Sequence, residues 1–435
     1  MMSRLAGVLI ATALVLSACS GGGGGGGTTA PAGQAPSGGQ AQGAATAAPA
    51  GGQAQGGTIK FASVHPLTGA LASSGVQMDH GVKLAVDAIN ADGGIKALNG
   101  AKLEMMSADT QGKPDVAQSE TQRLIDGGAV AIIGTYQSAA SVTVAQFAER
   151  SQVPFIIDVS VADNILQNGY KYTFRVQPNA TAMGTFGARY LKELSEKTNQ
   201  PVKTVGYLHE PSDFGTSVFK AFQAEAQKQG LEITKEVTYD LSQTDLTAQA
   251  TQALAGNPDV LAVSGYYADG VTLAKNLSLM KPNLKAVWGV ANGAFDAPDF
   301  PGAVGDQGNS YFDANYHYDA TSKHLQDVRT QYKQQFNEEM RTEAVFAYQD
   351  VYVLADALER AKSTDPKAIR DTLAKTSLKS DLIPMLGPIQ FDDKGENPNA
   401  APIINQVQGG QVLQVYPDNM AEKPPVFPAT AWSKP

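Results

Sequence analysis

Two adjacent pairs of side chains in this sequence could exchange protons with a substrate. His209 precedes Glu210, and Asp392 precedes Asp393. Groups of these types are candidates for general acid–base catalysis. The second pair opens the segment 392–395, Asp-Asp-Lys-Gly, which is typical of a turn between strands with its charges in solvent. Neither pair has a recognisable nucleophile beside it, so catalysis is disfavoured.

Other common signatures of chemistry are missing from the chain after its N-terminal segment. It has no G-x-S-x-G, no G-x-x-x-x-G-K-[ST] and no H-E-x-x-H. The G-x-G-x-x-G match lies in the glycine run 21–27, where no strand or helix could present it. With one cysteine and five histidines, no two of them at i, i+4 spacing, neither an internal disulfide nor a structural metal is expected. The sequence therefore predicts no enzyme activity, cofactor or metal.

The remaining candidate for chemistry is an anion site at a helix N-terminus. An apolar run at 129–134 predicts a buried strand, and an amphipathic helix is expected to begin soon after it. We expect Ser138 to be the N-cap, so that the free N–H groups of Ala139 and Ala140 could bind a carboxylate. Alternatively, Ser138 is an ordinary cap that bonds its own helix. The residues alone leave both interpretations open.

The elements that must position this site alternate between strand and helix. The chain of 435 residues is too long for one ordinary core, so two compact units are expected. Amphipathic stretches separate the short apolar runs, as in parallel sheets with helical crossovers. We therefore predict an α/β protein with two Rossmann-like lobes. The runs read as strands are 59–64, 103–106, 129–134, 154–157, 205–208, 260–263 and 286–288.

The N-terminus is predicted to be a targeting segment. Arg4 precedes an apolar run, Leu5 to Leu16, which is too short to span a bilayer and fits a secretory signal peptide over 1–18. The ending Leu-Ser-Ala-Cys resembles a bacterial lipobox, in which Cys19 is acylated; the alternative is an ordinary cleavage site with an incidental cysteine. Residues 20–57 carry no charge and consist of Gly, Ala, Pro, Gln, Ser and Thr. Together, 19–57 are expected to form a disordered tether with a lipidated end.

Five segments of the body together match a known pattern. They are 61–75 (FASVHPLTGALASSG), 81–95 (GVKLAVDAINADGGI), 108–111 (ADTQ), 133–138 (IGTYQS) and 170–175 (YKYTFR). The turn after the first helix, Asp-Gly-Gly, is the most specific mark. On these segments the chain resembles the branched-chain amino-acid-binding (Leu/Ile/Val-type) solute-binding lipoproteins of ABC importers. The resemblance extends from Thr58 to about Tyr416.

The resemblance implies a periplasmic-binding-protein fold of the first type, with two lobes, three crossings between them and capture of a solute by hinge closure. On that pattern, lobe 1 comprises 58–178 and 312–382, and lobe 2 comprises 179–311 and 383–435. It also implies the positions that contact the solute. They are Ser138, Ala139 and Ala140 for a carboxylate; Val159, Ser160 and Val161 for the head group, with Ser160 as the hydroxyl; Phe214 as an aromatic lid; and Tyr266 as a ligand-facing tyrosine.

One position departs from the family pattern. Where leucine-type binders place a carboxylate against the ammonium group, this chain has Asn292, which we still expect to line the site and contact the solute. A buried ammonium without an anionic partner is costly. Therefore either Asp269 or Asp213 substitutes, or the solute lacks an amino group. Both acids could also be N-caps of the helices that follow.

The function that these observations imply is solute capture outside the cell membrane. We expect a monomeric lipoprotein, anchored to the membrane in the periplasm or on the outer face, that delivers a branched-chain or other hydrophobic amino acid to an ABC permease. Alternatives are a non-amino organic acid or amide as ligand, or a sensor that reports closure. An enzyme on the same scaffold would use His209, Glu210 or Asp213. The formal net charge of −9 disfavours nucleic acid as a partner.

Overall fold

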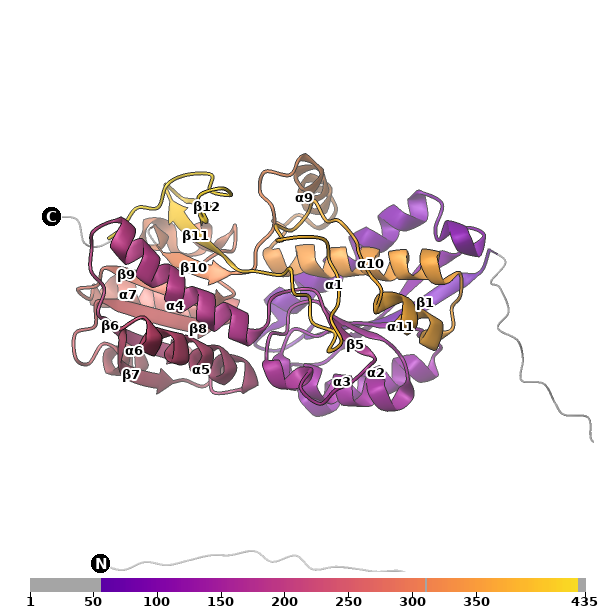
Figure 1. Ribbon diagram of the computed structural model, residues 1–435, viewed down its shortest axis with the longest axis horizontal. Helices are drawn as coiled ribbons and strands as arrows, with labels where there is room; N and C mark the ends of the chain where they lie inside the picture. The colour runs from indigo at the N-terminus through magenta and orange to yellow at the C-terminus, as the bar shows by residue number, and fades with distance from the viewer. Residues whose placement is uncertain (1–55, 310, 429–435) are drawn as a thin grey trace, which may run out of the picture. The chain divides into compact units, whose positions relative to one another are not determined.

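The computed structural model describes residues 56–309 and 311–428. The predicted signal peptide, Cys19 and all but the last two residues of the predicted tether therefore lie outside the described residues. Within the described chain, two sheets are each flanked by helices (Figure 1). This arrangement confirms the predicted α/β class with two lobes and mostly parallel sheets.

The first sheet has the strand order β2-β1-β3-β4-β5, and all of its pairs are parallel. Its inner strands are apolar because helices cover both faces. The three short strands end together at the edge where the candidate residues follow. The strands are β1 (Thr58–His65), β2 (Lys102–Asp109), β3 (Ile132–Gly134), β4 (Phe155–Ile157) and β5 (Thr173–Arg175).

The second sheet has the order β12-β11-β10-β9-β8-β6-β7. Its pairs from β10 to β7 are parallel, whereas β11 runs antiparallel to both β10 and β12. The strands are β6 (Thr204–His209), β7 (Glu232–Thr238), β8 (Val260–Gly265), β9 (Ala286–Asn292), β10 (Phe312–Asn315), β11 (Ile403–Gln408) and β12 (Gln411–Tyr416).

Helices from distant parts of the sequence complete the first lobe. The predicted stripe of α1, from Val82 to Ile89, is buried, and α10 packs along it although more than 250 residues separate them (Figure 1). Gly81 permits this approach, because a Cβ there would lie 2.3 Å from the Ala344 carbonyl oxygen. The helices of this lobe are α1 (Ala72–Ala91), α2 (Pro114–Asp126), α3 (Ser138–Ser151), α9 (Lys323–Phe336), α10 (Thr342–Ala361) and α11 (Pro366–Leu373).

The second lobe is covered by the helices between β5 and β10. Met183, Leu191 and Leu194 on α4 are buried as their spacing predicts. At Gly187 the helix approaches β9 so closely that a Cβ would lie 2.9 Å from Val290. The helices are α4 (Ala180–Lys197), α5 (Asp213–Lys228), α6 (Thr247–Ala253), α7 (Tyr267–Met280) and α8 (Phe300–Val304).

Two of the predicted lobe boundaries come too early in the chain. β10 pairs with β9 and β11, so the chain leaves the second sheet after Asn315 rather than at 312. The boundary at 383 is also early, because the segment around Gly395 still lies against β5. The Arg175 N–H donates to the Gly395 carbonyl at 2.8 Å, and the Arg175 guanidinium pairs with Glu396 at 2.6 Å. The other boundaries stay predictions.

Candidate functional site

A cavity lies where the carboxyl ends of the two sheets face each other, the position at which open α/β sheets bind ligands. It has about 330 Å³ of empty volume, and residues of both lobes line it. The lining residues are Tyr136, Ser138, Val159, Ser160, Val161, Phe214, Gly265, Tyr266, Ala291, Gly293, Asn315 and Tyr316.

Ser138 lines the cavity at the start of α3. It is the first helical residue, and Gln137 occupies the N-cap position without a side-chain cap, so the prediction that Ser138 is the N-cap was wrong by one residue. Its hydroxyl oxygen accepts from the Ala162 N–H at 3.2 Å. No acceptor for its own proton is found among the described residues, so this proton is available to a ligand. Ala139 and Ala140 do not line the cavity.

Ser160 also lines the cavity, but its polar atoms are engaged within the first lobe. Its hydroxyl donates to the Thr135 carbonyl at 2.6 Å and accepts from Ser141 at 2.7 Å. Its carbonyl accepts from Arg175 at 3.1 Å and from Gln177 at 2.9 Å. The segment from Val159 to Val161 is thus held in place by its own lobe, and its hydroxyl has little capacity left for a solute.

The opposite wall is built from aromatic rings. The Tyr266 ring lies 5.1 Å from the ring of Tyr136 and 5.1 Å from that of Phe214, so it bridges the two lobes. Gly293 makes room for this contact, because a Cβ there would lie 3.2 Å from the Tyr136 hydroxyl oxygen. Burial raises the pKa of Tyr136, Tyr266 and Tyr316, so all three hydroxyls are neutral. Phe214 and Tyr266 both line the cavity, and their contact with a solute stays a prediction.

Asn292, at the position where the family has a carboxylate, does not line the cavity. Asn292 is fully buried, and its side-chain oxygen accepts from the Ala294 N–H at 3.0 Å, whereas its neighbours Ala291 and Gly293 line the cavity. The prediction that the Asn292 side chain lines the cavity is therefore not met. Gly270 leaves space for the amide, since a Cβ there would lie 2.8 Å from its oxygen.

Neither acid considered as a substitute lines the cavity. Asp213 is exposed at the first position of α5, where Ser212 is the N-cap. Asp269 is buried behind Tyr266, whose N–H it accepts at 3.0 Å, and it also accepts from the Tyr239 hydroxyl. Burial raises the pKa of Asp269 to about 6, although these hydrogen bonds oppose the shift. The prediction that these acids are N-caps was also wrong, because Asp269 is the third residue of α7.

The groups first considered for acid–base chemistry have structural partners outside the cavity. The Glu210 carboxylate accepts from the Ser212 and Gly215 N–H groups, at 2.8 and 2.7 Å, and so binds the start of α5. His209 contacts the Glu210 carbonyl at 2.7 Å. Asp392 accepts from the Lys394 N–H at 2.8 Å, which is the predicted turn.

A charged contact joins the lobes beside the cavity. Arg341, at the start of α10, donates to Asp299 of the second lobe at 3.0 and 2.8 Å. Its guanidinium carbon lies 3.6 Å from the centre of the Tyr267 ring, and the Tyr267 hydroxyl donates to Asp299 at 2.9 Å. Arg341 is 8% exposed and Asp299 is 35% exposed. A paired, partly buried contact of this kind favours the closed arrangement.

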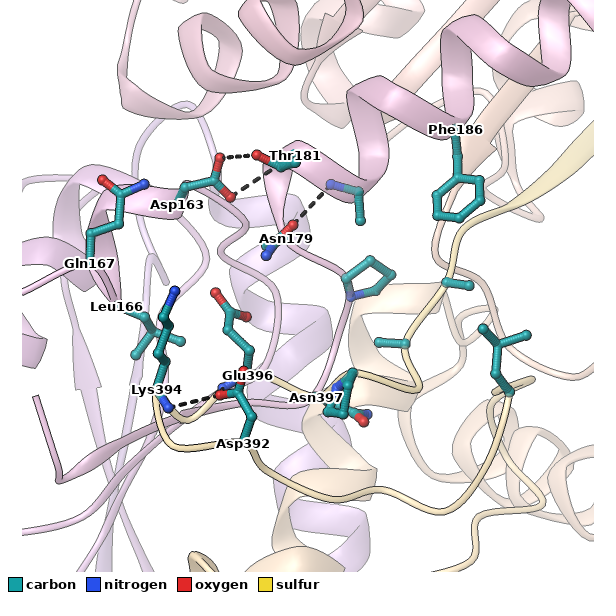
Figure 2. Close-up of a pocket in the computed structure, with 16 residues that line it drawn as sticks. Asp163, Leu166, Gln167, Asn179, Thr181, Phe186, Asp392, Lys394, Glu396 and Asn397 are labelled. Atoms are coloured by element: carbon teal, nitrogen blue, oxygen red, sulfur yellow. Dashed lines mark hydrogen bonds between the residues drawn. The ribbon is translucent and has the colours of Figure 1, made fainter. Parts of the chain in front are cut away.

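A wider hollow lies beside two of the crossings and has about 1120 Å³ of empty volume. Figure 2 shows that Asp163 faces Thr181, which donates to its carboxylate at 2.7 Å. The Glu396 carboxylate in the same hollow forms the ion pair with Arg175 described above. Its acidic groups already have partners, so this hollow is weaker than the interlobe cavity as a ligand site.

Sequence reasoning missed half of the lining. The missed residues lie within two positions of the carboxyl ends of β3, β8, β9 and β10, and strand ends are the signal that could have found them. Within residues 56–309 and 311–428, no cluster of His, Cys, Asp or Glu could hold a metal ion. The missed residues are Tyr136, Gly265, Ala291, Gly293, Asn315 and Tyr316.

Comparison with known proteins identifies the family. The model of the family described as "Periplasmic binding protein" matches residues 58–411. This chain belongs to the periplasmic binding protein family. The sequence-based resemblance to its branched-chain amino-acid-binding members is confirmed, and the family consists of solute-binding proteins rather than enzymes.

Individual relatives of this periplasmic binding protein agree in fold. The Leu/Ile/Val-binding protein homolog 7 of Brucella suis is 27% identical over 376 residues, covering 83% of this chain and 92% of the relative. LivJ of Streptococcus pneumoniae, a branched-chain amino acid transporter substrate binding protein solved with isoleucine, is 25% identical with a TM-score of 0.70, covering 82% and 97%. A solute binding protein of R. palustris solved with benzoate is 16% identical with a TM-score of 0.72, covering 86% and 97%.

Membership of this family implies a location outside the cytoplasm. None of the helices in the described part of the chain is long and apolar enough to cross a membrane.

Proposed function

We propose that this protein is the lipid-anchored, solute-binding component of an ABC importer. It captures a small solute with a carboxylate and an apolar body by closure of its two lobes, and passes it unchanged to a membrane permease. The observation that carries the proposal is the position of Ser138, with a hydroxyl proton free for an acceptor, in a cavity that is otherwise lined mainly by rings, aliphatic groups and glycines.

The carboxylate end of the solute belongs at α3. The N-terminus of this helix carries a partial positive charge, and Ser138 adds a donor at the same place. The lining holds no Lys, Arg or His, so no positively charged side chain of the cavity competes with α3 for the carboxylate. Val159 and Val161 on this side, and Phe214 and Tyr266 on the other, would enclose an apolar body.

The comparisons support a hydrophobic carboxylate but leave two kinds open. Isoleucine is the ligand of the LivJ structure, which favours a branched-chain or other hydrophobic amino acid. The benzoate of the R. palustris structure shows that the same fold accommodates an acid without an amino group. Both ligands combine a carboxylate with an apolar body, as the cavity requires.

Closure is the step that would complete the site. Tyr136 and Tyr266 touch across the lobes, and Arg341 pairs with Asp299, so a solute has to enter a more open form and be enclosed afterwards. Small-angle scattering with and without solute tests this step directly, since closure predicts a smaller radius of gyration. An unchanged profile with every solute that binds would contradict capture by closure.

The solute can be identified without choosing candidate compounds in advance. Mass spectrometry of small molecules released on denaturing the freshly purified protein should find a hydrophobic carboxylate. A thermal-shift panel then checks binding, since a ligand at 100 times its dissociation constant stabilises the fold by about 2.7 kcal/mol. Conversion of the solute by the purified protein would instead support the enzyme alternative.

The anchor is tested separately from binding. The full chain with Cys19 should fractionate with membranes and carry acyl chains, whereas Cys19→Ser should be released without loss of solute affinity. Retention of the Cys19→Ser protein in the membrane fraction would contradict lipidation at this residue.

A further inference from the structure

Asn315 places one unpaired hydrogen-bond acceptor in the wall of the cavity. It ends β10 and is 3% exposed. Its amide nitrogen donates to the Asn292 carbonyl at 3.3 Å and to Asp313 at 3.2 Å, whereas its side-chain oxygen is buried without a partner. Leaving a buried acceptor without a donor has a free-energy cost, because its hydrogen bond to water is not replaced. A solute with a matching donor would remove that cost.

The orientation of this amide is fixed by its surroundings. A backbone carbonyl such as that of Asn292 can only accept, so the group that faces it must be the amide nitrogen and not the oxygen. The oxygen is therefore the side-chain atom of this lining residue that keeps an unused hydrogen bond.

An ammonium group would have to compete for acceptors that the cavity already uses. It carries three protons, and each must be satisfied when the group is buried. Several lining carbonyls are already used. The Ser160 carbonyl accepts from Arg175 and Gln177, the Val161 carbonyl from the Ala180 N–H at 2.7 Å, and the Gly265 carbonyl from the Gly293 N–H at 2.9 Å. The side chains add Asn315 Oδ1 as one unpaired acceptor.

No anion in the lining would balance the charge of an ammonium group either. The twelve lining residues include no Asp or Glu. Asp313 and Asp296 lie behind Asn315, and burial raises the pKa of both well above its usual value, with each further raised by a neighbouring acid. These carboxyls are thus inclined to hold a proton rather than supply a negative charge.

We propose that Asn315 selects a solute whose polar group beside the carboxylate is a single neutral donor, such as a hydroxyl, rather than an ammonium. The inference rests on the proposed function and narrows its substrate class to hydroxylated hydrophobic carboxylic acids. One hydroxyl proton meets one free acceptor, and no buried charge is left without a partner.

Two matched sets of probes test the inference by calorimetry on the full chain. The first is 2-hydroxy-4-methylpentanoate, 4-methylpentanoate and leucine; the second is 3-phenyllactate, 3-phenylpropanoate and phenylalanine. In at least one set, the hydroxy acid should bind roughly tenfold tighter than the acid without a donor, the value of one buried hydrogen bond. The amino acid should bind more weakly than the hydroxy acid.

A variant identifies the residue responsible. Asn315→Leu should reduce the preference for the hydroxy acid over the unsubstituted acid to about one. Asn405→Leu is the matched control, because Asn405 is also a fully buried asparagine of the second sheet with unpaired side-chain atoms, but it does not line the cavity. It should keep the wild-type preference.

The possible outcomes separate this inference from the function on which it rests. If the amino acid binds tightest in each set that binds, or if Asn315→Leu keeps the hydroxy-acid preference, the inference is wrong while capture of a hydrophobic carboxylate stands. If none of the six probes binds to the folded wild-type protein, both the proposed function and the inference are contradicted. The ranking on the wild-type protein needs no variant, so a failure of Asn315→Leu to fold does not remove the test.

Discussion

The two walls of the cavity differ in how their groups are held. On the first lobe, the polar segment from Val159 to Val161 is fixed by hydrogen bonds within that lobe, including those of Ser160 to Thr135 and Arg175. On the second lobe, the wall is made of the Tyr266 and Phe214 rings, with the small residues of β9 between them. The first wall is preorganised for a head group whether or not the lobes are closed.

The aromatic wall meets its partner only in the closed arrangement. Tyr266 contacts Tyr136 of the other lobe, and its hold on the second lobe comes through Phe214 and the buried Asp269. The difference suggests a sequence of events in which the carboxylate is bound first and the rings then enclose the body. Changes in the second wall should therefore act mainly on release of the solute, and changes in the first wall on recognition of its carboxylate.

Removal of the ring that joins the walls should have the largest effect. We expect Tyr266→Ala to weaken solute binding by about 2–4 kcal/mol, because central buried aromatic residues dominate binding energies. Most of the loss should lie in the dissociation rate, measured by stopped-flow fluorescence or surface plasmon resonance. Tyr266→Phe keeps the ring and should retain most of the affinity. An affinity of Tyr266→Ala within threefold of wild type would show that the rings do not enclose the solute.

Removal of the free hydroxyl from the polar wall should have the next largest effect. Ser138→Ala deletes the donor to the carboxylate, and we expect a loss of about 1.5–3 kcal/mol in affinity, the range for a hydrogen bond to a charged group. Ser119→Ala is the control, because this exposed hydroxyl on α2 bonds only the Val116 carbonyl at 3.0 Å. Since Ser138 also accepts from Ala162, unfolding must be measured alongside titration. Unchanged affinity would reduce Ser138 to a structural role.

The sequence predicted residues of both walls, Ser138 from the local pattern and Phe214 and Tyr266 from the family resemblance, but it missed other lining residues. A strand followed by a helix puts residues such as Ser138 at a sheet edge, so their approximate position follows from periodicity. Tyr136 and Asn315 lie at strand ends in the same way, but whether a side chain faces the cavity depends on the partner lobe. That information resides in contacts between residues far apart in the chain.

The two wrong lobe boundaries have the same origin. β10 is short, and nothing in the run from Phe312 to Asn315 tells which sheet accepts its hydrogen bonds. The family pattern placed the segment around Glu396 in the second lobe, but its ion pair with Arg175 keeps it on the first. The replacement of the family carboxylate by Asn292 was visible in the sequence, whereas its rotation away from the cavity was not.

Asp269, which accepts a hydrogen bond from the Tyr266 N–H, should make the protein's stability respond to pH. Burial raises the pKa of Asp269 to about 6 from 3.8, so the folded state binds a proton more tightly than the unfolded state. Ionisation above pH 6 therefore costs stability, and the free energy of unfolding should rise as the pH falls from about 6 to 4. Relative to Asp269→Asn, the wild-type protein should gain about 1–3 kcal/mol over that window in urea titrations. Parallel pH profiles for the two proteins would contradict this role of Asp269.

The smallest expected effect tests whether the charged contact beside the cavity helps to close it. In a double-mutant cycle of Arg341→Gln and Asp299→Asn, we expect a coupling of about 1 kcal/mol in solute affinity. The pair is bidentate, but Asp299 is a third exposed, so solvent screens part of the attraction. The cycle is needed because Arg341 also lies 3.9 Å from Glu343. Each single change therefore also alters the surroundings of Glu343, and the cycle removes that contribution from the coupling. The exposed pair Lys83 and Asp87 on α1 is the control and should show no coupling in affinity. Zero coupling at Arg341 as well would mean that the rings close the cavity without help from this ion pair.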